Sequence, residues 1–176
     1  MRYIIYVILI GAILGITFGL FGVFNLRGFV PNLILLTVIA LSLVFDNFDY
    51  LFFGLIGGFW LDIVYGLPVG SFTIPLTLCG AVGNFFLKQW FFSEVQWYHF
   101  MGAIIAATVF VEFWLWGYTN LLVIFHWNVL AIAGKQIFSS LWMAVLVNII
   151  FSYPVYIVVE MFARSQLRWQ KNKLQI

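Results

Sequence analysis

Charged side chains are scarce in this sequence. Of its 176 residues, 8 are Lys or Arg and 6 are Asp or Glu, together 8% of the chain, whereas an average soluble domain is about 25% charged. In contrast, 65% of the residues are hydrophobic and 21% are aromatic. So few charges cannot cover a soluble surface, which excludes a soluble enzyme and a disordered tail. The net charge of +2 is also too small for a nucleic-acid binder, which needs a clustered basic face.

Cysteine is almost absent as well. The single Cys79 excludes a disulfide framework and a cysteine-rich metal site, and we expect it to be a small buried helix residue. The sequence shows no phosphate-binding glycine loop, no Ser-His-Asp set and no cluster of metal ligands. It therefore predicts no catalytic residue, no cofactor and no metal.

What the chain has in abundance is long apolar runs. A membrane-spanning helix needs roughly 20 mostly apolar residues, and hydropathy divides residues 1–176 into six such runs with short connections. We predict an all-α polytopic membrane protein that forms a single transmembrane domain. The second and third spans are short, so local thinning of the bilayer or a partly re-entrant third segment is possible. The predicted spans are residues 3–24, 29–45, 50–65, 70–87, 97–118 and 137–162.

The positions of the basic residues predict the orientation, because Lys and Arg in short loops mark the cytoplasmic side. With six spans, both termini are cytoplasmic and only Arg27 and Lys135 face outside. Residues 163–176 then form a basic cytoplasmic tail, which either contacts anionic lipid headgroups or is a solvated end that fixes the topology. The cations on the cytoplasmic side are Arg2, Lys88, Arg164, Arg168, Lys171 and Lys173.

Residues 119–136, between the fifth and sixth spans, are unusually apolar for a loop. An interfacial helix on the outer leaflet would bury the Leu, Ile and Phe residues of this segment and keep His126, Asn128 and Lys135 in water. The alternative is that the fifth span simply continues to about Ile124. The sequence favours the interfacial helix.

The first span carries glycines on one helical face. Gly11, Gly15 and Gly19 are spaced by four residues and Gly22 follows after three. Small residues in this pattern let another helix backbone approach closely. The face either packs against a neighbouring span of the same chain or receives the membrane helix of a partner.

Two carboxylates fall inside the predicted membrane region, where ionisable groups are costly and often functional. Asp62 lies near the outer end of the third span and Glu112 about five residues from the outer end of the fifth. They either line a polar pocket that opens outward, pair with Arg27 or Lys135, or make structural hydrogen bonds to nearby backbone or a helix end. Two carboxylates alone are not an acid–base pair.

Three other residues carry structural expectations. Asn148 in the sixth span and Asn84 near the inner end of the fourth should be satisfied by hydrogen bonds between helices. Pro154 should kink the sixth span.

The central stretch carries a recognisable order of motifs. A Pro-led helix begins at Pro31, and a glycine-rich helix then runs from Gly54 to Asp62. The turn Gly66-Leu67-Pro68-Val69-Gly70 leads into a helix with small residues at 79–83. This order resembles the family of the rod shape-determining protein MreD. The resemblance covers about residues 29–87 by motif and the rest by topology.

The resemblance implies a non-catalytic scaffold subunit of the cell-elongation machinery in the bacterial inner membrane, with a bundle similar to the S components of vitamin transporters. Its expected partner is MreC, a single-span protein, with indirect links to the actin-like MreB and to the RodA–penicillin-binding-protein wall synthase. The aspartate and turn of the family correspond here to Asp62, Pro68 and Gly70. Glu112 and residues 119–136 match no motif of the family.

A second class of function shares the predicted topology. A substrate-binding S-component-type subunit of a small-molecule (vitamin) transporter would also use a small-residue first helix. It should enclose a ligand-sized pocket with several convergent polar groups. The thin polar inventory of the predicted spans favours the scaffold.

Overall fold

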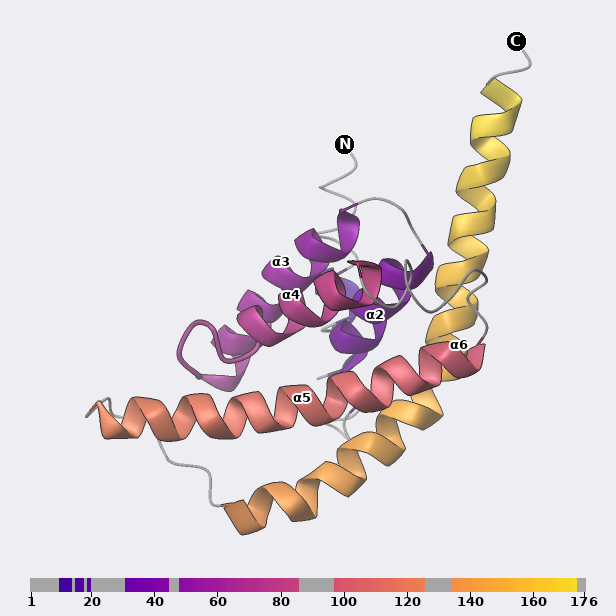
Figure 1. The fold of residues 1–176 in the computed structure, drawn as a ribbon. Helices are drawn as coiled ribbons and strands as arrows, with labels where there is room; N and C mark the ends of the chain where they lie inside the picture. The colour runs from indigo at the N-terminus through magenta and orange to yellow at the C-terminus, as the bar shows by residue number, and fades with distance from the viewer. Residues whose placement is uncertain are drawn as a thin grey trace.

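The described part of the chain is built from helices. The computed structural model describes residues 10–13, 15–17, 19, 31–44, 48–85, 97–125 and 134–173, and these contain no strand. The prediction of an all-α protein is therefore confirmed for these residues. The elements are α2 (Leu33–Val44), α3 (Asp49–Tyr65), α4 (Thr73–Val82), α5 (Trp97–Ile124) and α6 (Gly134–Lys173) (Figure 1). Residues 10–13, 15–17 and 19 are also helical and are called here the N-terminal helical segment.

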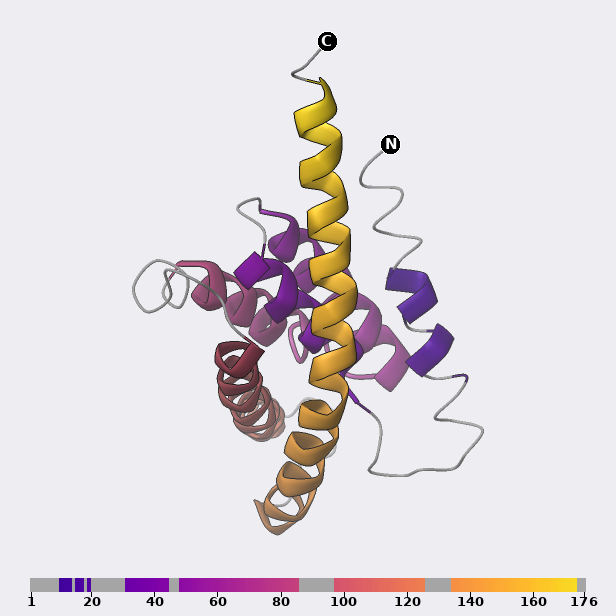
Figure 2. The ribbon, with the colours of Figure 1, turned by 90° about the vertical axis from the view of Figure 1, so that its right-hand side faces the viewer.

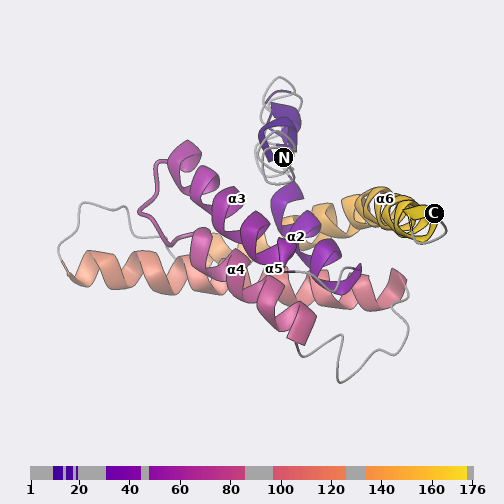
Figure 3. The ribbon, with the colours of Figure 1, turned by 90° about the horizontal axis from the view of Figure 1, so that it is seen from above.

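Helix α2 lies at the centre of the bundle. It packs against α3, α4, α5 and α6, and Figure 3 shows it between the α3–α4 pair and α6. Leu36, Val38 and Ala40 are fully buried. A helix that is apolar all round must be covered on every side, which accounts for the central position of α2.

Helices α3 and α4 form an antiparallel pair in close contact (Figure 3). The contact depends on glycine in α3, because a Cβ atom added to Gly58 would lie 2.5 Å from the Cα atom of Thr73. One turn earlier, a Cβ on Gly54 would lie 2.9 Å from the Cα atom of Thr77. The missing side chains let the two backbones approach each other. The glycine-rich pattern of α3 is thus used inside the chain.

Among the described residues, two helical stretches are long and apolar enough to cross a membrane. They are α5, with 28 residues, and Leu141–Met161 within α6. Helix α2 has 12 residues and is therefore about 18 Å long, which is shorter than the roughly 30 Å hydrocarbon core of a bilayer. By length and composition, the described helices therefore include two candidate membrane spans.

Helix α6 changes direction along its length. Figure 1 shows the bend between its orange and yellow parts, and Pro154 lies inside the helix. A proline removes one backbone hydrogen bond and clashes with the preceding turn, so the expected kink has its physical cause in this helix. Beyond the bend the backbone stays helical to Lys173. Residues 163–173 of the predicted tail therefore continue α6.

The structure corrects several predicted boundaries. Residues 119–124 continue α5 to Ile124. The prediction of a separate interfacial helix over the whole of 119–136 is therefore wrong. The alternative, a fifth helix that continues to about Ile124, is confirmed. Thr119 is fully buried and donates a hydrogen bond to the Leu115 carbonyl at 2.7 Å. Helix α2 begins at Leu33 and not at residue 29, and α4 begins at Thr73 and not at residue 70.

Candidate functional site

The turn between α3 and α4 has a fixed backbone. Helix α3 ends at Gly66, which has a φ of 63° and donates to the carbonyls of Asp62 and Ile63. Gly70 has a φ of 105°. Both values favour glycine, because a Cβ atom is strained at positive φ. Ser71 closes the turn by donating its backbone N–H (3.1 Å) and its hydroxyl (2.8 Å) to the Pro68 carbonyl.

The Asp62 carboxylate holds this turn from α3. Its Oδ1 accepts the backbone N–H of Phe72 at 2.6 Å, and its Oδ2 accepts the N–H of Gly70 at 2.9 Å. Oδ2 also accepts the hydroxyl of Thr73 at 2.6 Å and its N–H at 3.4 Å. Phe72 is the N-cap residue and Thr73 the first residue of α4, where unpaired N–H groups attract negative charge. The fully buried Asp62 therefore caps α4 from a neighbouring helix.

Two aromatic residues of α5 hold the other side of the turn. The indole Nε1 of Trp114 donates to the Gly70 carbonyl at 3.1 Å, and the Tyr118 hydroxyl donates to the Val69 carbonyl at 2.9 Å. The two rings are stacked with centroids 6.0 Å apart. Each side chain combines an apolar body with one polar donor. The turn is thereby fixed to α5 as well as to α3.

Asp62, Pro68 and Gly70 come together at this turn. Asp62 was expected to line a polar pocket, to pair with a cation or to make structural hydrogen bonds. The structure shows the third alternative, since both of its oxygens accept hydrogen bonds from the turn and from α4. The side chains of Arg27 and Lys135 lie outside the described ones.

A second polar group joins three helices. Asn148 of α6 accepts the backbone N–H of Asn32 at 2.9 Å and donates to the Thr108 hydroxyl of α5 at 3.0 Å. The Asn32 side chain in turn caps α2 by accepting the N–H of Leu35 at 3.0 Å. The predicted interhelical hydrogen bonding of Asn148 is confirmed. That of Asn84 is also confirmed, because its amide donates to the Tyr50 hydroxyl of α3 at 3.2 Å.

Replacing Asn148 by Ala is expected to lower the free energy of unfolding by about 2 kcal/mol, because the N–H of Asn32 and the Thr108 hydroxyl would lose a buried partner. Thermal unfolding in detergent measures the loss. Asn84→Ala is the matched control and should cost less, because it removes one longer hydrogen bond. Equal stability of Asn148→Ala and the parent chain would contradict the role of this network.

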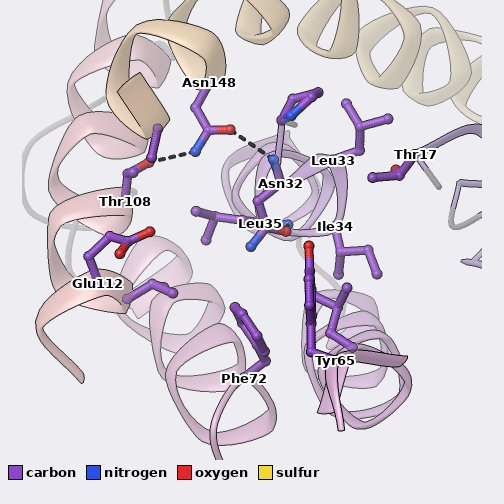
Figure 4. A pocket seen from close by; sticks show the side chains of 14 residues that line it. Thr17, Asn32, Leu33, Ile34, Leu35, Tyr65, Phe72, Thr108, Glu112 and Asn148 are labelled. Atoms are coloured by element: carbon purple, nitrogen blue, oxygen red, sulfur yellow. Dashed lines mark hydrogen bonds between the residues drawn. The ribbon is translucent and has the colours of Figure 1, made fainter. Parts of the chain in front are cut away.

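A cavity of about 120 Å³ lies beside this network (Figure 4). Its walls come from five helical segments, namely the N-terminal helical segment, the start of α2, the end of α3, α5 and α6, and from Phe72 just before α4. Among the lining polar groups, Asn148 and Thr108 are bonded to each other, and the Asn32 side chain caps α2. The lining residues are Thr17, Pro31, Asn32, Leu33, Ile34, Leu35, Leu61, Tyr65, Phe72, Thr108, Val111, Glu112, Ala144 and Asn148.

Glu112 is the one acidic residue among those that line the cavity. Figure 4 shows its carboxylate directed into the space that Asn32, Tyr65 and Phe72 also face. No described residue donates a hydrogen bond to it, in contrast to Asp62. Of the two carboxylates expected to line one polar pocket, Glu112 lines this cavity, while the Asp62 carboxylate points into the turn. Because α5 continues to Ile124, Glu112 lies twelve residues from the end of that helix and not five.

The glycine face of the N-terminal helical segment is not used inside the described structure. A Cβ atom added to Gly11, Gly15 or Gly19 would meet nothing within 4 Å. The opposite face packs inward, with Ile10 and Thr17 buried, and Figure 2 shows the segment at the edge of the bundle. Within the described part of the chain, no other helix packs against these three glycines. Gly22 lies outside the described residues.

Several residues of these sites were missed in the sequence. Asn32 follows Pro31 and precedes Leu35 by three residues, which is a recognisable helix-start signal. Trp114 and Tyr118 are four residues apart on one face of α5, a spacing that brings two side chains together. No local signal marks Thr108 or Tyr65, because their neighbours are distant in the sequence. Cys79 was correctly predicted and is buried with a free thiol.

Compared with known proteins, the chain matches no family model, no curated protein and no solved structure. Within the described residues, no three His, Cys, Asp or Glu side chains lie close enough together to hold a metal ion.

Proposed function

We propose that this chain is a multi-pass scaffold subunit of the bacterial inner membrane that holds the membrane helix of a single-span partner, as the resemblance to the MreD family implies. In this proposal the chain crosses the membrane six times with both termini in the cytoplasm. The partner is MreC, and the complex helps to couple MreB to the RodA–penicillin-binding-protein synthase and so to maintain cell shape.

The observation that carries the proposal is the open glycine face of the N-terminal helical segment. Gly11, Gly15 and Gly19 are exposed and have no neighbour where a side chain would be. Gly54 and Gly58 of α3, in contrast, lie against Thr77 and Thr73 of α4. In a membrane, a face of small residues allows close packing of a second helix. An exposed face of this kind supports docking of a partner's membrane helix.

The motif region supports the proposal in a second way. Its parts form one packed unit, in which α2 covers α3 and α4 and the Asp62 carboxylate fixes the turn between them. Such a unit is a rigid support for a partner. In this proposal Asp62, Pro68 and Gly70 hold the shape of the turn, and Asp62 and the turn 66–70 shape an outer notch that receives MreC.

The size of the cavity disfavours the vitamin-transporter alternative. Sites for small molecules and cofactors usually measure about 300–1,000 Å³, whereas this cavity measures about 120 Å³. A vitamin would not fit without a large rearrangement of five helical segments. We therefore prefer the scaffold to a transporter subunit.

Replacing Gly15 by Leu is expected to reduce the amount of MreC that co-purifies at least about tenfold, because the side chain would keep the two helix backbones apart. The stability of the chain alone should not change, since a Cβ atom there meets nothing within 4 Å. The measurement is co-purification from membranes in mild detergent, normalised to the amount of this chain.

Gly117→Leu is the matched control. Gly117 also has open space around its Cα atom, but it lies on α5, away from the proposed docking face. This variant should retain MreC. Equal retention by both variants would contradict docking at the N-terminal glycine face.

A further inference from the structure

The cavity beside Glu112 combines features that select a particular kind of ligand. It presents one carboxylate, the amide of Asn32 and the aromatic side chains of Tyr65 and Phe72 (Figure 4). Among the described residues that line it there is no Lys, Arg or His. An acidic group at this position in a membrane protein is costly unless a cation or a proton compensates it.

Three other polar side chains of the cavity, Asn32, Asn148 and Thr108, already make hydrogen bonds. The Oδ1 atoms of Asn32 and Asn148 accept the N–H groups of Leu35 and Asn32, and the Thr108 hydroxyl accepts from Asn148. These bonds leave few oxygens to complete the coordination shell of a metal ion, which takes six or more oxygens in the case of Ca²⁺. The carboxylate of Glu112 has no hydrogen-bond donor among the described residues.

The aromatic walls indicate an organic cation. The rings of Tyr65 and Phe72 lie with centroids 5.4 Å apart, at an interplanar angle of 32°, and both line the cavity. Aromatic faces attract ammonium groups, and a carboxylate forms charge-assisted hydrogen bonds with their N–H donors. The cavity volume of about 120 Å³ is well above the roughly 10–15 Å³ that one water molecule needs. That space suits an ammonium group on a short alkyl stem.

From this geometry we propose that the cavity binds a primary ammonium group, with Glu112 as its counter-ion and Tyr65 and Phe72 as its aromatic walls. The ammonium comes either from a soluble amine or from the headgroup of phosphatidylethanolamine. This binding is independent of partner docking, since the exposed glycine face lies on residues that do not line the cavity.

The first test is a calorimetric titration, in which ethanolamine hydrochloride is added to the purified full chain in detergent. Glu112→Gln should weaken binding at least about tenfold, because it removes the counter-ion. Glu160→Gln, a change of the same kind outside the cavity lining, should bind as the parent chain does. Choline should bind less tightly than ethanolamine, because its three methyl groups remove the N–H donors and add volume.

The second test separates the two sources of the ammonium. The parent chain and Glu112→Gln are placed in nanodiscs of equal parts phosphatidylethanolamine and phosphatidylglycerol, and native mass spectrometry counts retained lipids. Selective retention of phosphatidylethanolamine that Glu112→Gln loses assigns the site to the headgroup. Binding of ethanolamine without lipid selectivity assigns it to a soluble amine. Either result supports the proposal.

Three results would overturn it. The first is that neither ethanolamine nor phosphatidylethanolamine distinguishes the parent chain from Glu112→Gln. The second is that KCl or NaCl competes for the site as strongly as ethanolamine does at equal ionic strength. That result would indicate a site for a metal cation. The third is binding that arises only after Arg27 and Lys135 are both replaced by Ala, which would assign the site to a cation of the chain itself.

Discussion

Replacing Asp62 by Ala is expected to lower the free energy of unfolding by about 4 kcal/mol. The carboxylate is fully buried and accepts hydrogen bonds from Gly70, Phe72 and Thr73. Hydrogen bonds to a charged group contribute about 1.5–3 kcal/mol each, and their buried donors would be left without an acceptor. The change also removes the negative group at the start of α4. Thermal unfolding of the purified chain in detergent measures the effect.

The controls for Asp62 separate shape from hydrogen bonding. Asp62→Asn keeps the shape but places an amide N–H₂ group against backbone N–H donors, so most of the loss should remain. Glu112→Gln makes the same carboxylate-to-amide change where no described residue donates a hydrogen bond, and it should unfold close to the parent chain. Unfolding of Asp62→Ala at the temperature of the parent chain would contradict the capping role.

Replacing Gly58 by Leu is expected to have the second large effect, a loss of about 3 kcal/mol or more, in the upper range for overpacked positions. The new Cβ atom would lie 2.5 Å from the Cα atom and 2.8 Å from the nitrogen of Thr73. Because these are backbone atoms, α4 itself has to move away. Asp62 lies one turn along α3 and would lose its bonds to Thr73 in the same movement. Unfolding in detergent and the yield of folded protein both measure the loss.

Smaller substitutions make this prediction sharper. Gly58→Ala should cost about 2 kcal/mol, since even a methyl group is too close to the Thr73 backbone. Gly15→Ala and Gly102→Ala should cost nothing or stabilise slightly, because Ala is a better helix former and nothing lies within 4 Å of either added Cβ atom. If all three Ala variants had the same stability as the parent chain, the close packing of α3 on α4 would be wrong.

The existence of the helices could be predicted from the sequence, but the ends of α4 and α5 could not. Hydropathy continues through residues 70–72, yet Gly70 has a φ of 105° and Asp62 holds the N–H groups of Phe72 and Thr73. Contacts with α3 therefore decide where α4 begins. For α5, the predicted fifth span ends at residue 118. The fully buried Thr119 instead continues the helix by bonding to Leu115.

The candidate site was predictable in its residue types but not in its arrangement. Because charged residues are scarce, Asp62 and Glu112 stand out in the sequence. In the structure Asp62 accepts hydrogen bonds from the turn, and Glu112 lines the cavity. The sequence could not show that the Asp62 carboxylate accepts hydrogen bonds from residues eight to eleven positions later in the chain. Nor could it show that Glu112 faces a cavity. Nor could spacing distinguish glycines that pack inside the chain, such as Gly58, from those that stay open, such as Gly15. That difference depends on which helices are neighbours.

The central claim, that the exposed glycine face of the N-terminal helical segment holds a partner's membrane helix, is tested most directly by crosslinking. A photo-crosslinking amino acid replaces Gly15 in one variant and Gly117 in another, both positions with open space around them. Each variant is expressed with MreC and irradiated in intact membranes. We expect a covalent adduct with MreC from position 15 and none from position 117. An adduct from position 117 alone, or from neither position, would contradict it.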